Sequence, residues 1–95
     1  MAHLNGSEIL ARALKLEGVD ELFFLMGGPM LAAEAATIKE GIRCIDVRHE
    51  QAAAMMAQAY SRLQQRPGVC MAASGPATIN LSTGLANALI DCCPV

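Results

Sequence analysis

The sequence has no stretch of about 18 consecutive apolar residues, the length that a membrane-spanning helix needs. Its first residues, Met-Ala-His-Leu-Asn-Gly, lack the basic segment and following apolar segment of a secretory signal. The formal net charge is -2, so the chain has no excess of basic residues that would attract nucleic acid. These absences predict a cytoplasmic protein that binds neither nucleic acid nor membranes.

The sequence also lacks two cysteines separated by two residues, the spacing typical of a zinc site. The cysteines that it does have are Cys44, Cys70, Cys92 and Cys93. Cys44 and Cys70 lie in apolar runs, where a thiol packs like a small apolar side chain. We therefore expect reduced, buried thiols and no metal bound by this chain.

Two common phosphate-binding patterns, Gly-x-Gly-x-x-Gly and the P-loop, are missing as well. The chain has two other glycine-proline turns, Gly27-Gly28-Pro29 and Ser74-Gly75-Pro76. Glycine lets the backbone approach a ligand closely. No lysine lies near either turn, so phosphate binding has little support. Each turn taken alone is typical of an ordinary connection from a strand to a helix.

Apolar residues make up 54% of the chain and charged residues only 17%. This apolar share is high for a short chain, because small domains have much surface for their volume. We therefore expect further chain, another domain or another subunit to cover several of its faces.

Strand-like and helix-like segments alternate along the sequence. Ser7 is expected to cap a first helix that ends at Gly18. The expected strands cover residues 21–25, 42–47 and 69–73, and the later helices cover residues 31–40, 50–65 and 78–91. This order predicts an α/β fold with a parallel sheet and helices on both faces. Three parallel strands leave a bare edge, so residues 1–95 are expected to be the N-terminal part of a larger domain.

Glu50 stands where the second expected strand meets the third expected helix, in the run Ile-Asp-Val-Arg-His-Glu-Gln-Ala-Ala-Ala. Its carboxylate is thereby placed at the carboxyl end of a strand, the edge where open α/β sheets bind ligands. Both glycine-proline turns also follow strands and converge on this edge. We infer that Glu50 is the functional centre of the chain. A purely structural role, as an acid favoured by the positive end of a helix, is the alternative.

Four stretches of the sequence carry a resemblance to a known family. They are Leu-Lys-Leu-Glu-Gly-Val at 14–19, Val-Arg-His-Glu-Gln-Ala-Ala at 47–53, Pro-Gly-Val-Cys at 67–70, and the block from Ser-Gly-Pro at 74 to Ala at 88. Together they resemble the N-terminal pyrimidine-binding (Pyr) domain of thiamine diphosphate-dependent enzymes. Acetolactate synthases, benzoylformate decarboxylases, oxalyl-CoA decarboxylases and 2-hydroxyacyl-CoA lyases belong to this family. The resemblance covers the whole chain and implies the N-terminal portion of a flavodoxin-like fold.

The resemblance implies a specific role for Glu50. In the family, the glutamate at this position hydrogen-bonds the N1′ atom of the aminopyrimidine of thiamine diphosphate. This contact favours the imino tautomer, whose 4′-nitrogen removes the proton from C2 of the cofactor. A carboxyl group among small apolar neighbours, such as Ala52, Ala53 and Ala54, is expected to have a raised pKa because of desolvation. Such a pKa would suit a proton shared with a ring nitrogen.

Further site residues follow from the same resemblance. Those expected around the cofactor, besides Glu50, are Gly27, Gly28, Ser74, Gly75, Pro76 and Asn80. Those expected at the substrate pocket are Met26, Pro29, His49 and Ala77, although a structural role for His49 is equally open. Met26 and Ala77 stand where many members have proline and glycine, so we expect a reshaped pocket. Arg48 is expected to pair with an acid.

The family binds the cofactor's diphosphate through Mg²⁺, which a Gly-Asp-Gly motif holds on a separate C-terminal domain. This chain has no such motif, so it is expected to supply the pyrimidine-activating half only and not to bind the whole cofactor alone. The partners that the resemblance implies are the remainder of the same enzyme and further subunits of a homodimer or homotetramer. Met55 and Met56 are expected to pack against a partner, with the cofactor between subunits. A nucleotide in a middle domain is compatible with the resemblance.

The end of the chain, Asp91-Cys92-Cys93-Pro94, resembles the Asn-Cys-aromatic-Pro of oxalyl-CoA decarboxylases and 2-hydroxyacyl-CoA lyases. It favours a carbon-carbon lyase that cleaves, or forms, a 2-hydroxyacyl-CoA, with a carbonyl compound and formyl-CoA on the other side of the reaction. An acetolactate synthase or 2-oxo acid decarboxylase reaction remains an alternative. A non-catalytic assembly domain is a third, and the presence of Glu50 argues against it.

Overall fold

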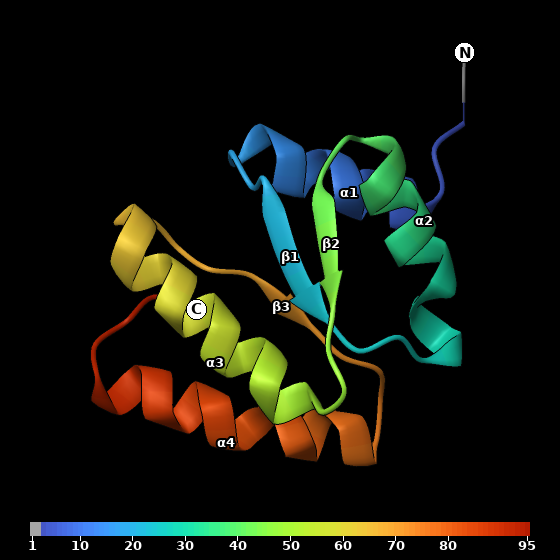
Figure 1. The fold of residues 1–95 in the computed structure, drawn as a ribbon. Helices are drawn as coiled ribbons and strands as arrows, with labels where there is room; N and C mark the ends of the chain where they lie inside the picture. The colour runs from blue at the N-terminus through green and yellow to red at the C-terminus, as the bar shows by residue number, and fades with distance from the viewer. Residues whose placement is uncertain (1–2) are drawn as a thin grey trace.

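The computed structural model describes residues 3–95 and shows helices and strands in alternation (Figure 1). The elements are α1 (Gly6–Leu16), β1 (Glu21–Phe24), the 3₁₀ helix η1 (Gly28–Met30), α2 (Leu31–Lys39), β2 (Arg43–Asp46), α3 (Glu50–Gln64), β3 (Cys70–Met71) and α4 (Pro76–Ile90). The predicted order is confirmed, and each strand is shorter than predicted. Two residues just outside the strands still hydrogen-bond to β1. The N–H of Val47 donates to the carbonyl oxygen of Phe24 at 2.9 Å, and the N–H of Phe23 donates to the carbonyl oxygen of Val69 at 3.1 Å.

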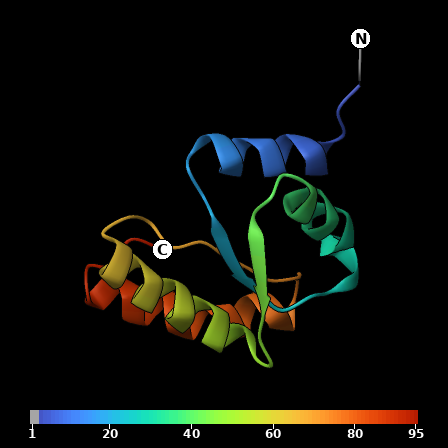
Figure 2. The same cartoon turned by 45° about the horizontal axis from the view of Figure 1, so that its top comes forward.

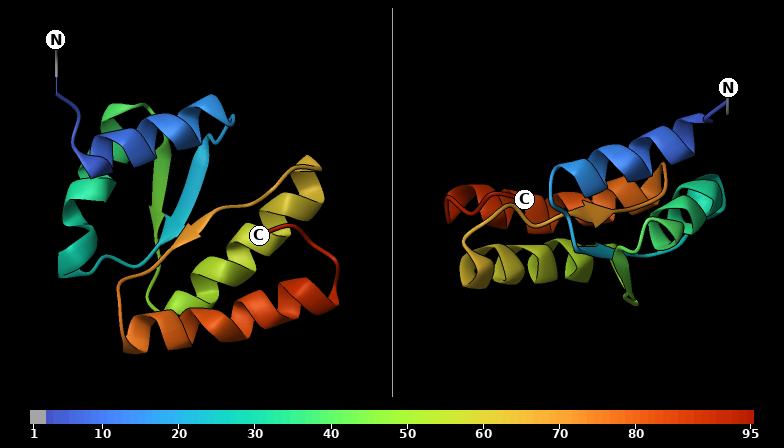
Figure 3. Two further views of the ribbon diagram at one scale, coloured as in Figure 1. Left: turned by 180° about the vertical axis from the view of Figure 1, so that it is seen from behind. Right: turned by 90° about the horizontal axis from the view of Figure 1, so that it is seen from above.

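The strands form one parallel sheet in the order β2-β1-β3. Phe23 of β1 pairs with Ile45 of β2 on one side and with Cys70 of β3 on the other. Helix α3 covers one face of the sheet, and α1 and α2 lie on the other side (Figures 1 and 3). The predicted α/β fold with helices on both faces is therefore confirmed. Central strand β1 is the best-covered element, with three of its four residues buried.

The core between the sheet and α3 combines large side chains of the strands with alanines of the helix. Phe23 and Val47 pack against Ala53 and Ala57, both of which are fully buried. The ring of Phe23 also meets that of Tyr60 edge-on, with 5.8 Å between the ring centroids. Because alanine side chains are short, α3 lies close to the sheet, and its first turn is held firmly at the sheet's carboxyl edge.

The start of α1 differs from the prediction. Asn5, not Ser7, caps the helix, and Ser7 lies inside its first turn. The side chain of Asn5 accepts a hydrogen bond from the backbone N–H of Glu8 at 2.9 Å, and the carboxylate of Glu8 accepts one from the N–H of Asn5 at 3.0 Å. This reciprocal capping box satisfies two donors that would otherwise lack partners, whereas Ser7 has no acidic or amide side chain three residues later.

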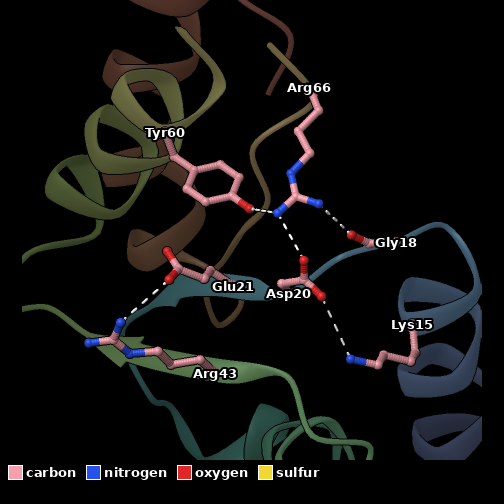
Figure 4. A network of polar contacts seen from close by, with 7 residues as sticks. All are labelled: Lys15, Gly18, Asp20, Glu21, Arg43, Tyr60 and Arg66. Atoms are coloured by element: carbon pink, nitrogen blue, oxygen red, sulfur yellow. Dashed lines mark hydrogen bonds and ion pairs between the residues drawn. The ribbon is translucent and has the colours of Figure 1, made fainter. Parts of the chain in front are cut away.

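A polar network joins several elements at the amino ends of the strands (Figure 4). Arg66 donates to Asp20 at 2.9 Å, to the carbonyl oxygen of Gly18 at 3.2 Å and to the hydroxyl of Tyr60. Lys15 approaches the other carboxylate oxygen of Asp20 at 3.7 Å. The network therefore ties the end of α1 and the start of β1 to α3 and to the loop before β3.

This network predicts a loss of stability in acid. Hydrogen bonding and charge from Arg66 lower the pKa of Asp20 below its ordinary value of 3.8. The carboxylate's contribution to the free energy of unfolding is therefore complete above about pH 4 and is lost as the pH falls through the lower folded-state pKa. Urea unfolding between pH 2 and 7 should show a shallower acid slope for Asp20→Asn than for the wild type. Glu17→Gln is the control, because Glu17 forms no ion pair within residues 3–95. Equal slopes in wild type and Asp20→Asn would contradict the prediction.

Candidate functional site

The carboxyl edge of the sheet brings together the segments that sequence analysis singled out. The strands point toward this edge, and α3 and α4 both begin there (Figure 1). Glu50 is the first residue of α3, directly after its N-cap His49. Pro76 is the first residue of α4, and the Ser74-Gly75 turn precedes it. The predicted placement of Glu50 at a strand-to-helix junction on this edge is confirmed.

Glu50 is held by a residue far away in the sequence. The side-chain amide of Asn80, in the second turn of α4, donates a hydrogen bond to Oε2 of Glu50 at 2.9 Å. Glu50 is buried, with 8% of its surface exposed. Within residues 3–95 the side-chain hydrogen bonds of Glu50 engage Oε2 only. Asn80 thus holds the carboxylate through Oε2, and no other side chain among residues 3–95 hydrogen-bonds it.

The pKa of Glu50 moves in the direction opposite to the prediction. The hydrogen bond from Asn80 lowers it below its ordinary value of 4.5, and a backbone hydrogen bond at the start of α3 and the charge of His49 act in the same sense. Burial raises the pKa but is outweighed. The expectation of a raised pKa is therefore wrong for these residues. The alanines around Glu50 were visible in the sequence, but the amide that meets its carboxylate belongs to another helix.

The two glycine-proline turns lie against each other. A Cβ atom placed on Gly27 would lie only 2.4 Å from the Cβ of Ala73, which precedes the Ser74-Gly75-Pro76 turn. Thr78 of α4 donates its hydroxyl to the carbonyl oxygen of Ala73 at 2.8 Å. The sequence therefore correctly predicted that these turns converge on one edge. A side chain at Gly27 would push them apart.

The predicted substrate-pocket residues are less closely gathered. Met26 is 53% exposed, Pro29 lies exposed in η1, and Ala77 is half-buried in the first turn of α4. The Nδ1 atom of exposed His49 accepts a hydrogen bond from the backbone N–H of Gln51 at 3.1 Å. This contact gives His49 the structural role of a helix cap, one of the two roles left open by the sequence. Arg48 pairs with Asp46, as predicted.

One group of polar contacts further along α3 and α4 was missed by sequence reasoning. Gln58 of α3 is buried and contacts both Asn87 and Asp91 of the α4 segment. Gln58 stands eight residues after Glu50, which places both on the same side of a helix. A glutamine among the alanines of this helix was the signal of a buried polar contact that the sequence offered. Its partners could not be identified from the sequence, because they depend on how α4 packs on α3.

A hollow of about 300 Å³ lies at the opposite, amino end of the sheet, beside Tyr60 and Arg66.

Within residues 3–95, no group of three or more His, Cys, Asp or Glu side chains is arranged to hold a metal ion. In the same residues, no helix is both long and apolar enough to cross a membrane.

The four cysteines are free thiols, and their burial differs from the prediction. Cys44, Cys70 and Cys93 are half-buried, and Cys92 is exposed. Cys44 lies on the edge strand β2, which has a neighbour on one side only. Cys92 follows the end of α4. The expectation that the thiols are buried is therefore wrong for Cys92 and only partly right for the others.

Known proteins resemble this chain along nearly its whole length. The sequence model of the family described as "Thiamine pyrophosphate enzyme, N-terminal TPP binding domain" matches residues 4–95. The chain is 42% identical over 92 residues to the acetolactate synthase isozyme 2 large subunit of Escherichia coli (strain K12), a match that covers 97% of this chain and 17% of the relative. It is 39% identical over 92 residues to 2-hydroxyacyl-CoA lyase 1 of Homo sapiens, covering 97% of this chain and 16% of the relative. The chain thus spans less than a fifth of the length of these relatives.

Proposed function

The chain belongs to the thiamine pyrophosphate enzyme family, as its N-terminal cofactor-binding domain, and from this we propose that Glu50 activates the aminopyrimidine of the cofactor. The observation that carries the proposal is the position of its carboxylate. Glu50 is buried at the carboxyl edge of a parallel sheet and is held through Oε2 by Asn80 at 2.9 Å. A carboxylate fixed through one oxygen can present the other to a ring nitrogen in a constant direction.

The residues around Glu50 fit a heteroaromatic ring that carries a weakly basic nitrogen. Ala53 and Ala54, which follow Glu50 in the first turns of α3, are fully buried and bring no polar side chain to this end of the helix. The touching turns at Gly27 and Ala73 bring backbone without bulky side chains to the same edge. Thiamine diphosphate, when bound, supplies a carbon acid at C2 that becomes the nucleophile of the reaction. Glu50 contributes by sharing a proton with N1′ of the pyrimidine.

The lowered pKa of Glu50 favours a negative charge on the carboxylate and the shared proton on the ring nitrogen. Glu50 is ionised at neutral pH, because Asn80 favours the charged form of its carboxylate. An ionised carboxylate accepts a hydrogen bond from a protonated ring nitrogen and stabilises the positive charge there. Asn80 thereby acts as a positioning residue that keeps the carboxylate both oriented and charged.

We propose that other parts of the enzyme complete the cofactor site to which Glu50 belongs. We propose that Mg²⁺ and the diphosphate are bound on another domain, since the Gly-Asp-Gly motif of the family is not in this sequence. We also propose that a second subunit packs on α3 and α4 in a homodimer or homotetramer. Support comes from the partly exposed Met55 and Met56 of α3, together with Ile79, Leu89 and Ile90 of α4.

For the substrate, we propose a 2-hydroxyacyl-CoA, cleaved into a carbonyl compound and formyl-CoA. The Asp91-Cys92-Cys93-Pro94 segment supports this choice, and a human relative bears the name 2-hydroxyacyl-CoA lyase 1. Acetolactate synthesis from a 2-oxo acid is the second candidate, because relatives at 41–42% identity bear that name.

The substrate proposal is tested by comparing two assays of the full protein supplied with thiamine diphosphate and Mg²⁺. We expect release of formyl-CoA from a 2-hydroxyacyl-CoA, and little or no acetolactate from pyruvate. The difference in rate should exceed about 100-fold, because a site built to bind the polar groups of one substrate strongly disfavours an analogue without them. Turnover of pyruvate with none of the acyl-CoA would replace the lyase proposal with the synthase reaction.

A further inference from the structure

Helices α3 and α4 run side by side (Figures 1 and 2). A chain of polar contacts follows the seam between them beyond Glu50 and Asn80. Gln58 is at the centre of this chain. Its Oε1 atom accepts a hydrogen bond from the amide of Asn87 at 2.8 Å, and its own amide donates to Oδ2 of Asp91 at 2.7 Å. Arg62 pairs with the same oxygen of Asp91 at 2.9 Å.

The rest of the seam is built from small side chains. Buried Gly84 of α4 lies against Ala54, and Ala53, Ala57 and Ala88 are buried nearby. The close fit of Gly84 against Ala54, where a Cβ atom on Gly84 would lie only 2.5 Å from the Ala54 Cβ, sets how near the two helices approach and restricts sliding of α4 along α3. It makes no hydrogen bonds, so a directional restraint on this register has to come from polar contacts. Polar contacts between helices do fix such a register, because their geometry is lost when the helices shift.

Gln58 is well placed to set the register of this pair. It is 6% exposed, and both ends of its amide are used, one as acceptor and one as donor. Sliding α4 by one residue would move its side chains by about 1.5 Å, enough to break both contacts. The same slide would separate Asn80 from Glu50, because their hydrogen bond is already at 2.9 Å.

We propose that Gln58 is a positioning residue of the site, which fixes the register of α4 on α3 through Asn87 and Asp91 and so holds Asn80 against Glu50. It acts eight residues away from Glu50 and touches neither Glu50 nor Asn80 in the structure. Its importance for catalysis rests on the function proposed for Glu50. The effect of Gln58 on the geometry of the Glu50–Asn80 pair can be tested without assuming that function.

The test uses Gln58→Leu in the full protein without added cofactor. Leucine fills a similar volume but can neither accept from Asn87 nor donate to Asp91. We expect a crystal structure of the variant to show the Asn80 amide beyond hydrogen-bond distance of Glu50. We also expect carboxyl-carbon NMR of the labelled protein to show the pKa of Glu50 rising toward its ordinary value of 4.5, since the bond from Asn80 is the main cause of its lowering. His49, whose electrostatic interaction with Glu50 also lowers this pKa, is present in every variant.

Two controls separate positioning from general loss of stability. Gln64→Leu makes the same substitution at an exposed position of α3 and should leave the pKa of Glu50 unchanged. Thr37→Val removes a buried hydrogen bond of 2.7 Å to the carbonyl oxygen of Ala33 within α2. Whatever its effect on the unfolding midpoint, it should not move the pKa of Glu50, because α2 does not contact the Glu50–Asn80 pair.

If Gln58→Leu does not fold, Asn87→Ala provides the milder variant, because Asn87 is exposed and supplies only one of the two contacts. The proposal is overturned if the folded variant keeps the Asn80–Glu50 bond and the wild-type pKa, or if Thr37→Val shifts that pKa as much. These outcomes are independent of the function proposed for Glu50. That function fails by a different result, unchanged cofactor activation in a Glu50 variant.

Discussion

Replacing Glu50 by glutamine in the full protein is expected to slow exchange of the C2 proton of bound thiamine diphosphate by about 10²–10⁴-fold, the range for loss of a positioned acid or base. Glutamine keeps the length and shape of the side chain, and its carbonyl oxygen can still accept the hydrogen bond that Asn80 gives to Glu50. It cannot carry the negative charge that stabilises a protonated ring nitrogen. The loss should therefore appear in the activation of the cofactor and not in the folding of the domain.

The measurement is the rate at which the C2 proton exchanges with deuterium oxide, followed by rapid quenching and NMR of the released cofactor. Glu40→Gln is the matched control, because Glu40 is the capping residue after α2, where it pairs with Arg12. Its exchange rate should equal that of the wild type. Exchange at the wild-type rate in Glu50→Gln, with the cofactor shown to be bound, would contradict the role proposed for Glu50.

The main features of the site were predictable because they depend on local pattern and on chain order. Apolar runs that alternate with helical segments predict a parallel sheet, and a parallel sheet brings the carboxyl ends of its strands to one edge. Glu50 and the two glycine-proline turns each follow a strand in the sequence, so their convergence needed no knowledge of packing. The touching turns at Gly27 and Ala73 bear this out.

The features that were missed depend on contacts between distant segments. The sign of the pKa shift at Glu50 is set mainly by Asn80, thirty residues away and on another helix. The contacts of Gln58 with Asn87 and Asp91 join two helices whose packing against each other the sequence does not reveal. The cap of α1 was missed for a local reason, since Asn5 and Glu8 form a pattern that could have been recognised.

Gly68→Ala is expected to destabilise the domain by about 3 kcal/mol, the upper end of the usual cost of overpacking. Gly68 is buried in the loop between α3 and β3, and a Cβ atom there would lie 2.1 Å from the carbonyl oxygen of Ala57 and 2.7 Å from its carbonyl carbon. Both atoms belong to the backbone of α3, so no side chain can rotate away to make room. The loop or the helix must move.

That movement would disturb the packing of α3 on the sheet, because Ala57 is a fully buried residue of α3 in the core beside Phe23 and Val47. Urea unfolding of the full protein should show a lower midpoint for Gly68→Ala with little change in the dependence on denaturant. Gly6→Ala is the matched control, since a Cβ atom at Gly6 meets nothing within 4 Å and alanine favours the helix that begins there. Its midpoint should equal or exceed that of the wild type. A Gly68→Ala variant as stable as Gly6→Ala would show that α3 and the loop before β3 are not packed as closely as the structure places them.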